Sequence, residues 1–156
     1  MLKDYPVMVD VVVRWGDMDA LHHVNHTLYL QYFETARVEY LVRLGMEAPG
    51  PKWQEYGLIL ASVACRYRIP VTYPDTLTIG ARVAAMGEDR VLMEHAAFSQ
   101  KLGKVAAEGD AIVVSYDYVA GRRTSLRSNL REAILALEKR EIPALPRPNS
   151  PRQGSA

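Results

Sequence analysis

The sequence contains a single cysteine, Cys65, among its 156 residues. One thiol cannot form an intrachain disulfide, and it supplies no cluster of thiolates for a metal ion. No stretch approaches the roughly 20 apolar residues of a membrane-spanning helix, and the N-terminal residues lack the apolar run of a signal peptide. We therefore expect a soluble protein of the reducing cytoplasm, with no membrane as partner.

Charge of one sign is not in excess, because 19 Lys and Arg stand against 18 Asp and Glu. A protein that attracts nucleic acid through its overall field needs a strong positive excess, so nucleic acid is not an expected partner. Hydrophobic residues make up 49% of the chain, enough for one core, and we predict a single domain over residues 1–141. The last residues, 142–156, are rich in Pro, Arg, Ser and Gly and are predicted to form a disordered tail.

The first two elements are indicated by two different hydrophobic periods. Residues 7–14 alternate between apolar and polar, which predicts a half-buried strand. From about residue 26 to residue 44 the apolar residues recur every three or four positions without Gly or Pro, which predicts a long helix. Gly45 follows directly and suits the left-handed conformation that ends many helices.

Four later segments are rich in β-branched or alternating apolar residues and are bounded by turn residues or proline. They predict strands at about 58–69, 77–85, 91–101 and 104–118. Tight turns join the last three into an antiparallel meander. A final helix is predicted over 129–139, with Ser128 as its cap and an apolar stripe formed by Leu130, Ile134 and Leu137.

This order of elements indicates an α+β fold in which one sheet covers the long helix. Such a sheet has edge strands with unpaired backbone groups, and these are commonly satisfied by a second subunit. We therefore expect a dimer.

Ionisable side chains are concentrated between the first predicted strand and the long helix. The connection contains Asp17, Asp19, His22, His23, Asn25 and His26. The N-terminus of a helix presents unpaired N–H groups and the positive end of its dipole, which suit an oxygen that gains negative charge, such as an acyl carbonyl. A carboxylate a few residues upstream can attack that carbonyl or activate a water molecule. The pattern is therefore compatible with acyl-transfer chemistry.

The same residue types also have simpler roles. Composition alone favours Asp17 and Asp19 as turn formers or caps, and Asn25 as the N-cap of the helix. His22 and His26 are four residues apart and can act with Asp17 as metal ligands, although a helix starting at Asn25 would place its cap between them. The residue types alone do not decide between catalytic, capping and metal-binding roles.

Three side chains outside the connection are also candidates for ligand binding. Tyr29 has the helical spacing of a core aromatic. Arg66 and Arg68 are two residues apart on a predicted strand and share a face, where they either form a solvated edge or meet the phosphates of a ligand.

The residues of this connection resemble a known signature. The run RWGDMDALHHVN, from Arg14 to Asn25, resembles that of the 4-hydroxybenzoyl-CoA thioesterase-like branch of the hotdog superfamily, as do the following Tyr29, Tyr32, Glu34, Ala36 and Arg37. A second family element is similar to Arg68, Pro70 and Tyr73-Pro74-Asp75, so the resemblance runs from about residue 7 to residue 118. It implies a hotdog domain, in which a curved antiparallel sheet of about five strands wraps a long central helix. It also implies homodimers, often paired again into homotetramers, with active sites at the subunit interface.

The resemblance further implies hydrolysis of an acyl-CoA or acyl-carrier-protein thioester to a free acid and a thiol, with no metal or redox cofactor. The family's catalytic carboxylate, a nucleophile or a general base, maps onto Asp19, while Asp17 shapes the loop. The backbone N–H that polarises the thioester carbonyl maps near His26. The coenzyme A portion would bind without a Walker-type loop, its phosphates resting on surface residues such as Arg66 or Arg68.

The sequence departs from the family pattern at two positions. His22 stands where relatives usually have Gly, and His26 stands where many have a second Asn. A glycine lets the backbone approach a substrate closely, so an imidazole narrows the site, adds a hydrogen bond or signals a changed backbone. We therefore expect substrate choice to differ. The candidate substrate-binding residues are His22, His23, Asn25, Tyr29, Arg66 and Arg68.

Two other functions remain compatible with the sequence. One is a non-catalytic acyl-thioester binding protein in which His22 fills the site. The other is a metal-dependent hydrolase built on His22, His26 and Asp17. Fold alone does not decide between them, because one fold hosts many functions.

Overall fold

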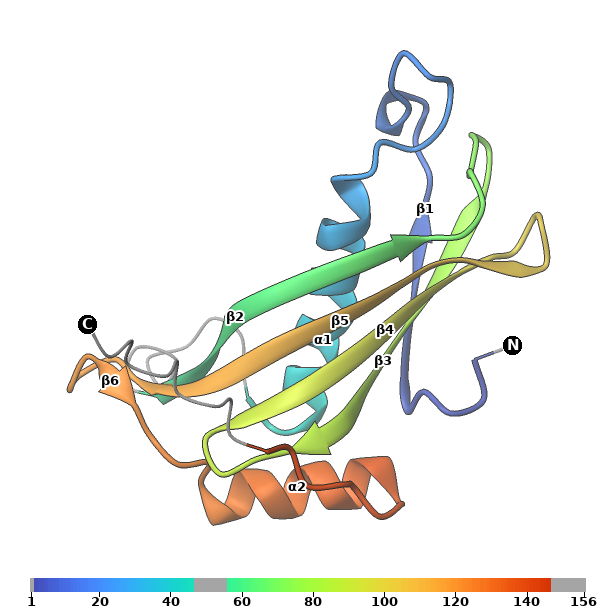
Figure 1. Ribbon diagram of the computed structural model, residues 1–156. Helices are drawn as coiled ribbons and strands as arrows, with labels where there is room; N and C mark the ends of the chain where they lie inside the picture. The colour runs from blue at the N-terminus through green and yellow to red at the C-terminus, as the bar shows by residue number, and fades with distance from the viewer. Residues whose placement is uncertain (1, 47–55, 147–156) are drawn as a thin grey trace, which may run out of the picture.

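One antiparallel sheet curves around a long helix in the computed structural model, which describes residues 2–46 and 56–146 (Figure 1). The strands are β1 (Val7–Val12), β2 (Tyr56–Tyr67), β3 (Thr76–Met86), β4 (Arg90–Ser99), β5 (Lys104–Asp117) and the short β6 (Arg122–Arg123). The helices are α1 (Leu28–Arg43) and α2 (Ser128–Glu138), and a 3-10 turn, η1, spans Trp15–Asp17. Within the described residues no helix is both long and apolar enough to cross a membrane. The predicted α+β class, with a central helix and five principal strands, is confirmed.

The strand order in the sheet is β1-β3-β4-β5-β2, and β6 pairs with β5. The successive pairs β3–β4 and β4–β5 are antiparallel, so the predicted meander is confirmed. β2 does not pair with the strand that follows it in the chain. It lies against β5 instead, with Tyr56 opposite Asp117 and Tyr67 opposite Ala107. β1 and β2 are consequently the two edges of the sheet.

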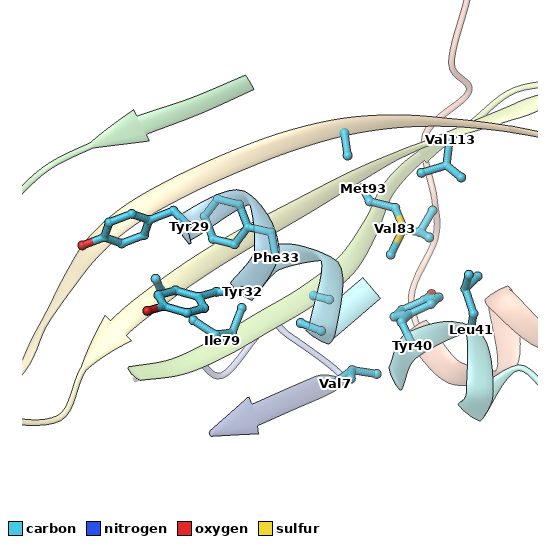
Figure 2. Close-up of a cluster of buried hydrophobic side chains, with 14 of the residues drawn as sticks. Val7, Tyr29, Tyr32, Phe33, Tyr40, Leu41, Ile79, Val83, Met93 and Val113 are labelled. Atoms are coloured by element: carbon cyan, nitrogen blue, oxygen red, sulfur yellow. The ribbon is translucent and has the colours of Figure 1, made fainter. Parts of the chain in front are cut away.

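The core lies between α1 and the concave face of the sheet. Figure 2 shows aromatic side chains of α1 packed against strand residues that include Ile79, Val83, Met93 and Val113. The buried residues of α1 are Tyr29, Tyr32, Phe33, Ala36, Arg37, Tyr40 and Leu41. Their spacing is the three-and-four period that predicted the helix. The chain leaves α1 through Gly45, whose φ of +82° confirms the expected left-handed termination.

The final helix confirms the predicted stripe and corrects the predicted cap. Leu130 and Ile134 are buried, as expected. Ser128, however, is the first residue of α2, and Arg127 occupies the N-cap position without a side-chain cap, so the cap prediction is wrong by one residue. The helix is held at its other end by Glu138, whose buried carboxylate accepts a hydrogen bond from the Tyr40 hydroxyl at 2.8 Å.

Residues 142–146 belong to the segment predicted as a disordered tail, and for these residues the prediction is wrong. Met86 N donates to Pro143 O at 2.9 Å, and Leu145 N donates to Met86 O at 3.0 Å. Ile142 is partly buried against the core. Composition did not indicate this because the pairing partner is the distant end of β3. The remaining residues of the predicted tail, 147–156, lie outside the described residues.

A histidine is buried beneath α1. His95 on β4 is only 1% exposed, its ring stacks on Phe33 with centroids 5.3 Å apart, and neither ring nitrogen has a hydrogen-bond partner in the described part of the chain. Gly109 lies opposite it on β5, where a Cβ would come within 2.5 Å of the Phe33 ring, so the close packing requires glycine. Burial and the Arg37 guanidinium lower the pKa of His95 to about 4. The buried ring is therefore neutral at pH 7.

This burial predicts a loss of stability in mild acid. His95 takes up a proton near pH 6.5 in the unfolded chain but only near pH 4 in the folded chain, so the unfolded state binds more protons between these values. The free energy of unfolding should fall by about 2 kcal/mol between pH 7 and pH 5 as a result. Urea unfolding across this range measures the decrease, which His95→Leu should remove and the exposed substitution His22→Asn should retain. An unchanged pH dependence in His95→Leu would contradict the assignment.

Candidate functional site

The segment that carries the carboxylates is a short hairpin between η1 and α1 (Figure 1). Asp19 N donates to His23 O at 3.1 Å, and Asn25 N donates to Asp17 O at 2.9 Å. These backbone bonds turn the chain back on itself. The side chain of Asp19 consequently lies beside the residues that begin α1.

Two donors hold the Asp19 carboxylate. Its Oδ1 accepts a hydrogen bond from Leu21 N at 2.8 Å, and its Oδ2 accepts one from Asn25 Nδ2 at 3.3 Å. Asn25 Oδ1 in turn accepts hydrogen bonds from the Thr27 N–H at 3.0 Å and the Thr27 hydroxyl at 2.7 Å. Asn25 therefore caps the start of the helix with its side chain, although the N-cap position itself is Thr27. One amide side chain links the carboxylate to the helix N-terminus.

The backbone N–H of His26 is a free donor at this helix end. The neighbouring donors are used, because Thr27 N binds Asn25 Oδ1 and Leu28 N binds Asn25 O at 3.0 Å. The His26 N–H has no hydrogen-bond partner among residues 2–46 and 56–146. At the N-terminus of α1 it also lies at the positive end of the helix dipole, which favours an oxygen that carries negative charge.

Asp19 and His26 line one hollow of about 330 Å³. Its remaining walls are formed by Leu21, His23, Val24, Tyr29, Tyr67, Arg68, Ile69 and Pro70. The pocket thus brings together most of the predicted site residues, with Asn25 bound to Asp19 at its side. Its walls combine apolar surface with a carboxylate, imidazoles and a guanidinium, a composition typical of small-molecule sites.

Besides Asn25, two further predicted site residues, His22 and Arg66, are not among the residues that line this pocket. Arg66 Nη2 lies 2.8 Å from Asp110 on β5, and Arg68 Nη2 lies 2.6 Å from Glu108. Arg66 lies on β2 and Arg68 lies one residue beyond its end, and both are paired with carboxylates of β5. The substrate-binding roles of His22 and Arg66 remain predictions.

The backbone at His22 has a φ of +65°, in the left-handed region. Glycine adopts this conformation without a steric penalty, whereas a side chain with a Cβ does not. At this position the backbone has a conformation that favours glycine, while the residue carries an exposed imidazole.

Asp17 binds the hairpin and α1 and does not line the pocket. Its Oδ2 accepts hydrogen bonds from Arg14 N at 2.8 Å and from the Tyr32 hydroxyl at 3.0 Å. Burial and the bond to Asp17 raise the pKa of Tyr32 well above its usual value, so the phenol remains a donor. Over the described residues, no three His, Cys, Asp or Glu side chains gather closely enough to hold a metal ion. The alternative ligand set His22, His26 and Asp17 is therefore not assembled in this geometry.

Tyr67, at the end of β2, is a polar pocket residue that the sequence did not single out. Its hydroxyl donates to His26 O at 3.0 Å, and its ring packs edge-on against the Tyr29 ring at 5.4 Å. Tyr67 is 41 residues from His26 in sequence, so only the packing of β2 against the start of α1 brings them together. Its position next to Arg68, in the second family element, was the one signal that could have indicated it.

Known thioesterases are similar to this chain in sequence and in fold. A family model described as "Thioesterase-like superfamily" matches residues 13–134. The long-chain acyl-CoA thioesterase FadM of Escherichia coli (strain K12) is 23% identical over 137 residues, covering 85% of this chain and 100% of that protein. A solved thioesterase of Thermus thermophilus, complexed with coenzyme A and Zn, is 32% identical with a TM-score of 0.78, covering 90% of this chain and 100% of that one. A DHNA-CoA thioesterase of Staphylococcus aureus, 18% identical with a TM-score of 0.74 over 89% of this chain and 98% of that one, shares the fold. The predicted hotdog fold is thereby confirmed.

The backbone at His22 yields a prediction about stability. Replacing His22 with Gly should raise the free energy of unfolding by about 1 kcal/mol, because the left-handed conformation is unfavourable for residues with a Cβ. Ala keeps the Cβ, so His22→Ala is the matched control and should show little gain. Urea unfolding at pH 7 compares the two variants with the wild type. Equal stabilities of the Gly and Ala variants would show that the backbone is not strained at this position.

Proposed function

The chain belongs to the Thioesterase-like superfamily, and from this premise we propose that it hydrolyses acyl-CoA thioesters with Asp19 as the catalytic carboxylate. The predicted enzyme class, a thioester hydrolase, is confirmed by the family match and by the similar thioesterase structure. The observation that carries it is that Asp19 and His26, whose backbone N–H is free, line one pocket.

The two groups supply complementary parts of the reaction. The thioester carbonyl oxygen accepts a hydrogen bond from His26 N–H, and the helix N-terminus stabilises the negative charge that develops there. A donor of this kind is worth about 10²–10³ in rate. Asp19 either attacks the carbonyl carbon, giving an anhydride that water hydrolyses, or takes a proton from the attacking water. In both routes the C–S bond breaks, the thiol leaves with one proton, and a carboxylic acid is released.

The remaining pocket residues divide between the two ends of such a substrate. Tyr29 is buried in the wall, where burial and nearby Cys65 raise its pKa to about 12, so it offers a neutral aromatic surface to an acyl group. His23 lines the same wall. Arg68 has a charged end suited to the phosphates of the coenzyme A portion or to the surface of an acyl carrier protein. Asn25 keeps the Asp19 carboxylate oriented toward these groups.

We also infer that the protein is a cytoplasmic homodimer, formed through the exposed edge of β2. Two such dimers can pair again. Residues 60–64 of this strand are all exposed, and the edge carries the apolar side chains Leu60 and Val63. An exposed apolar strand edge favours pairing with a second copy, because pairing satisfies its backbone groups. Antiparallel pairing about this centre would bring the pocket end of β2 near the opposite end of the partner's strand. The pocket would then lie at the subunit interface.

The role of Asp19 is tested by replacing one oxygen of its carboxylate. Asp19→Asn should lower kcat/KM by about 10²-fold or more on short, long and aromatic acyl-CoAs, because the amide is neither a nucleophile nor a base. The control is Asp10→Asn on β1, an exposed carboxylate outside the pocket, and it should keep wild-type activity. Thiol release followed with a chromogenic disulfide reports all rates. Full activity of Asp19→Asn would refute the role of Asp19. If the wild-type protein bound acyl-CoAs without hydrolysing them, the non-catalytic alternative would be favoured.

The role of the β2 edge is tested by placing a charge at its centre. Val63→Arg should convert a dimer into a monomer, because two like charges would face each other across the paired strands. The control is Val119→Arg, which changes a more exposed valine in the turn after β5 and should leave the dimer intact. Sedimentation velocity measures the mass in solution. A monomeric wild type, or a dimeric Val63→Arg variant, would contradict the proposed interface.

A further inference from the structure

The free N–H of His26 belongs to the Asn25–His26 peptide group, and hydrogen bonds hold both this group and the His26–Thr27 group that follows it. The preceding carbonyl, that of Asn25, accepts a hydrogen bond from Leu28 N at 3.0 Å. The following N–H, that of Thr27, donates to Asn25 Oδ1 at 3.0 Å. The His26 carbonyl stands outside the helical ladder, since Leu30 N donates to Thr27 O at 3.3 Å. The oxygen of this carbonyl therefore takes its donor from elsewhere in the fold, as a second hold on the same peptide group.

That partner comes from the edge strand. The Tyr67 hydroxyl donates to His26 O at 3.0 Å, and its ring packs edge-on against the rings of Tyr29, at 5.4 Å, and His26, at 6.3 Å. Partial burial and the neighbouring Cys65 thiol raise the pKa of Tyr67 to about 12. The hydroxyl therefore carries its proton at neutral pH and can remain a donor.

We propose that Tyr67 is a positioning residue, which aims the His26 N–H at the substrate carbonyl by holding the His26 C=O. The inference rests on the proposed function, because it concerns how the carbonyl donor is oriented. With the peptide groups on both sides of His26 held, its φ and ψ are fixed and its N–H keeps one direction. The alignment matters because hydrogen bonds weaken steeply when bent, and a donor stabilises an oxyanion only at the place where that oxygen forms.

Tyr67→Phe removes the hydroxyl and keeps the ring. We expect kcat on the best acyl-CoA substrate to fall about 10- to 100-fold, because the donor is no longer aimed, while KM changes less than about twofold. The matched control is Tyr118→Phe, another exposed tyrosine with an edge-on aromatic neighbour, which lies outside the pocket and should keep both constants. Thermal unfolding of both variants should stay close to that of the wild type.

A second measurement reports on the carbonyl directly. In the Asp19→Asn background, the infrared stretch of a bound acyl-CoA labelled with ¹³C at its thioester carbonyl should lie below that of the free compound. Adding Tyr67→Phe should move the stretch back toward the free value. A merely structural role for Tyr67 would lower the unfolding temperature and leave this stretch unchanged.

The outcomes separate this inference from the function on which it rests. If Asp19→Asn abolishes hydrolysis while Tyr67→Phe keeps the wild-type kcat and carbonyl stretch, the inference is overturned and the proposed function stands. A rise in KM alone also overturns it, since that result would mark Tyr67 as a direct substrate contact. A wild-type enzyme that hydrolyses no acyl-CoA overturns the proposed function, and the inference with it.

Discussion

The hydrogen bonds of the Asn25 side chain are the interaction on which the site depends. Its amide nitrogen binds the Asp19 carboxylate, and its amide oxygen binds both donors of Thr27 at the start of α1. A helix N-terminus leaves backbone N–H groups without partners, and here a side chain satisfies one while His26 N–H stays free. The same side chain therefore links the Asp19 carboxylate to the helix end that carries the free His26 N–H. The two groups proposed as catalytic move together if it moves.

The sheet gives this arrangement a fixed support. α1 is clamped by its buried aromatic face, as Figure 2 shows, so its N-terminus cannot shift without disturbing the core. β2 serves both the pocket and the surface of the sheet. Its end supplies Tyr67 to the pocket, and its middle is an exposed edge. Pairing of that edge with a second copy would stiffen the strand that holds the His26 carbonyl. Assembly and catalysis would then be linked through one strand.

Local patterns in the sequence predicted most of the fold, and long-range contacts explain the rest. The period-two and three-and-four patterns located β1, α1 and the meander, because side-chain period depends only on neighbouring residues. The binding of residues 142–146 to the end of β3, the pairing of β2 with β5 and the contact of Tyr67 with His26 depend on segments far apart in sequence. Asp19 and His26 were indicated by family resemblance, and the left-handed backbone of His22 suits the glycine that the resemblance led us to expect there.

The central claim is that the His26 N–H receives the thioester carbonyl beside Asp19. The most direct measurement is the amide ¹H–¹⁵N spectrum of the wild-type protein, titrated with a non-hydrolysable acyl-CoA ketone in which a methylene replaces the sulfur. We expect a downfield shift of the His26 amide proton that saturates with binding and is larger than the shifts of neighbouring amides that already have partners. Saturable binding of the ketone that leaves the His26 amide unmoved would contradict the role proposed for this N–H.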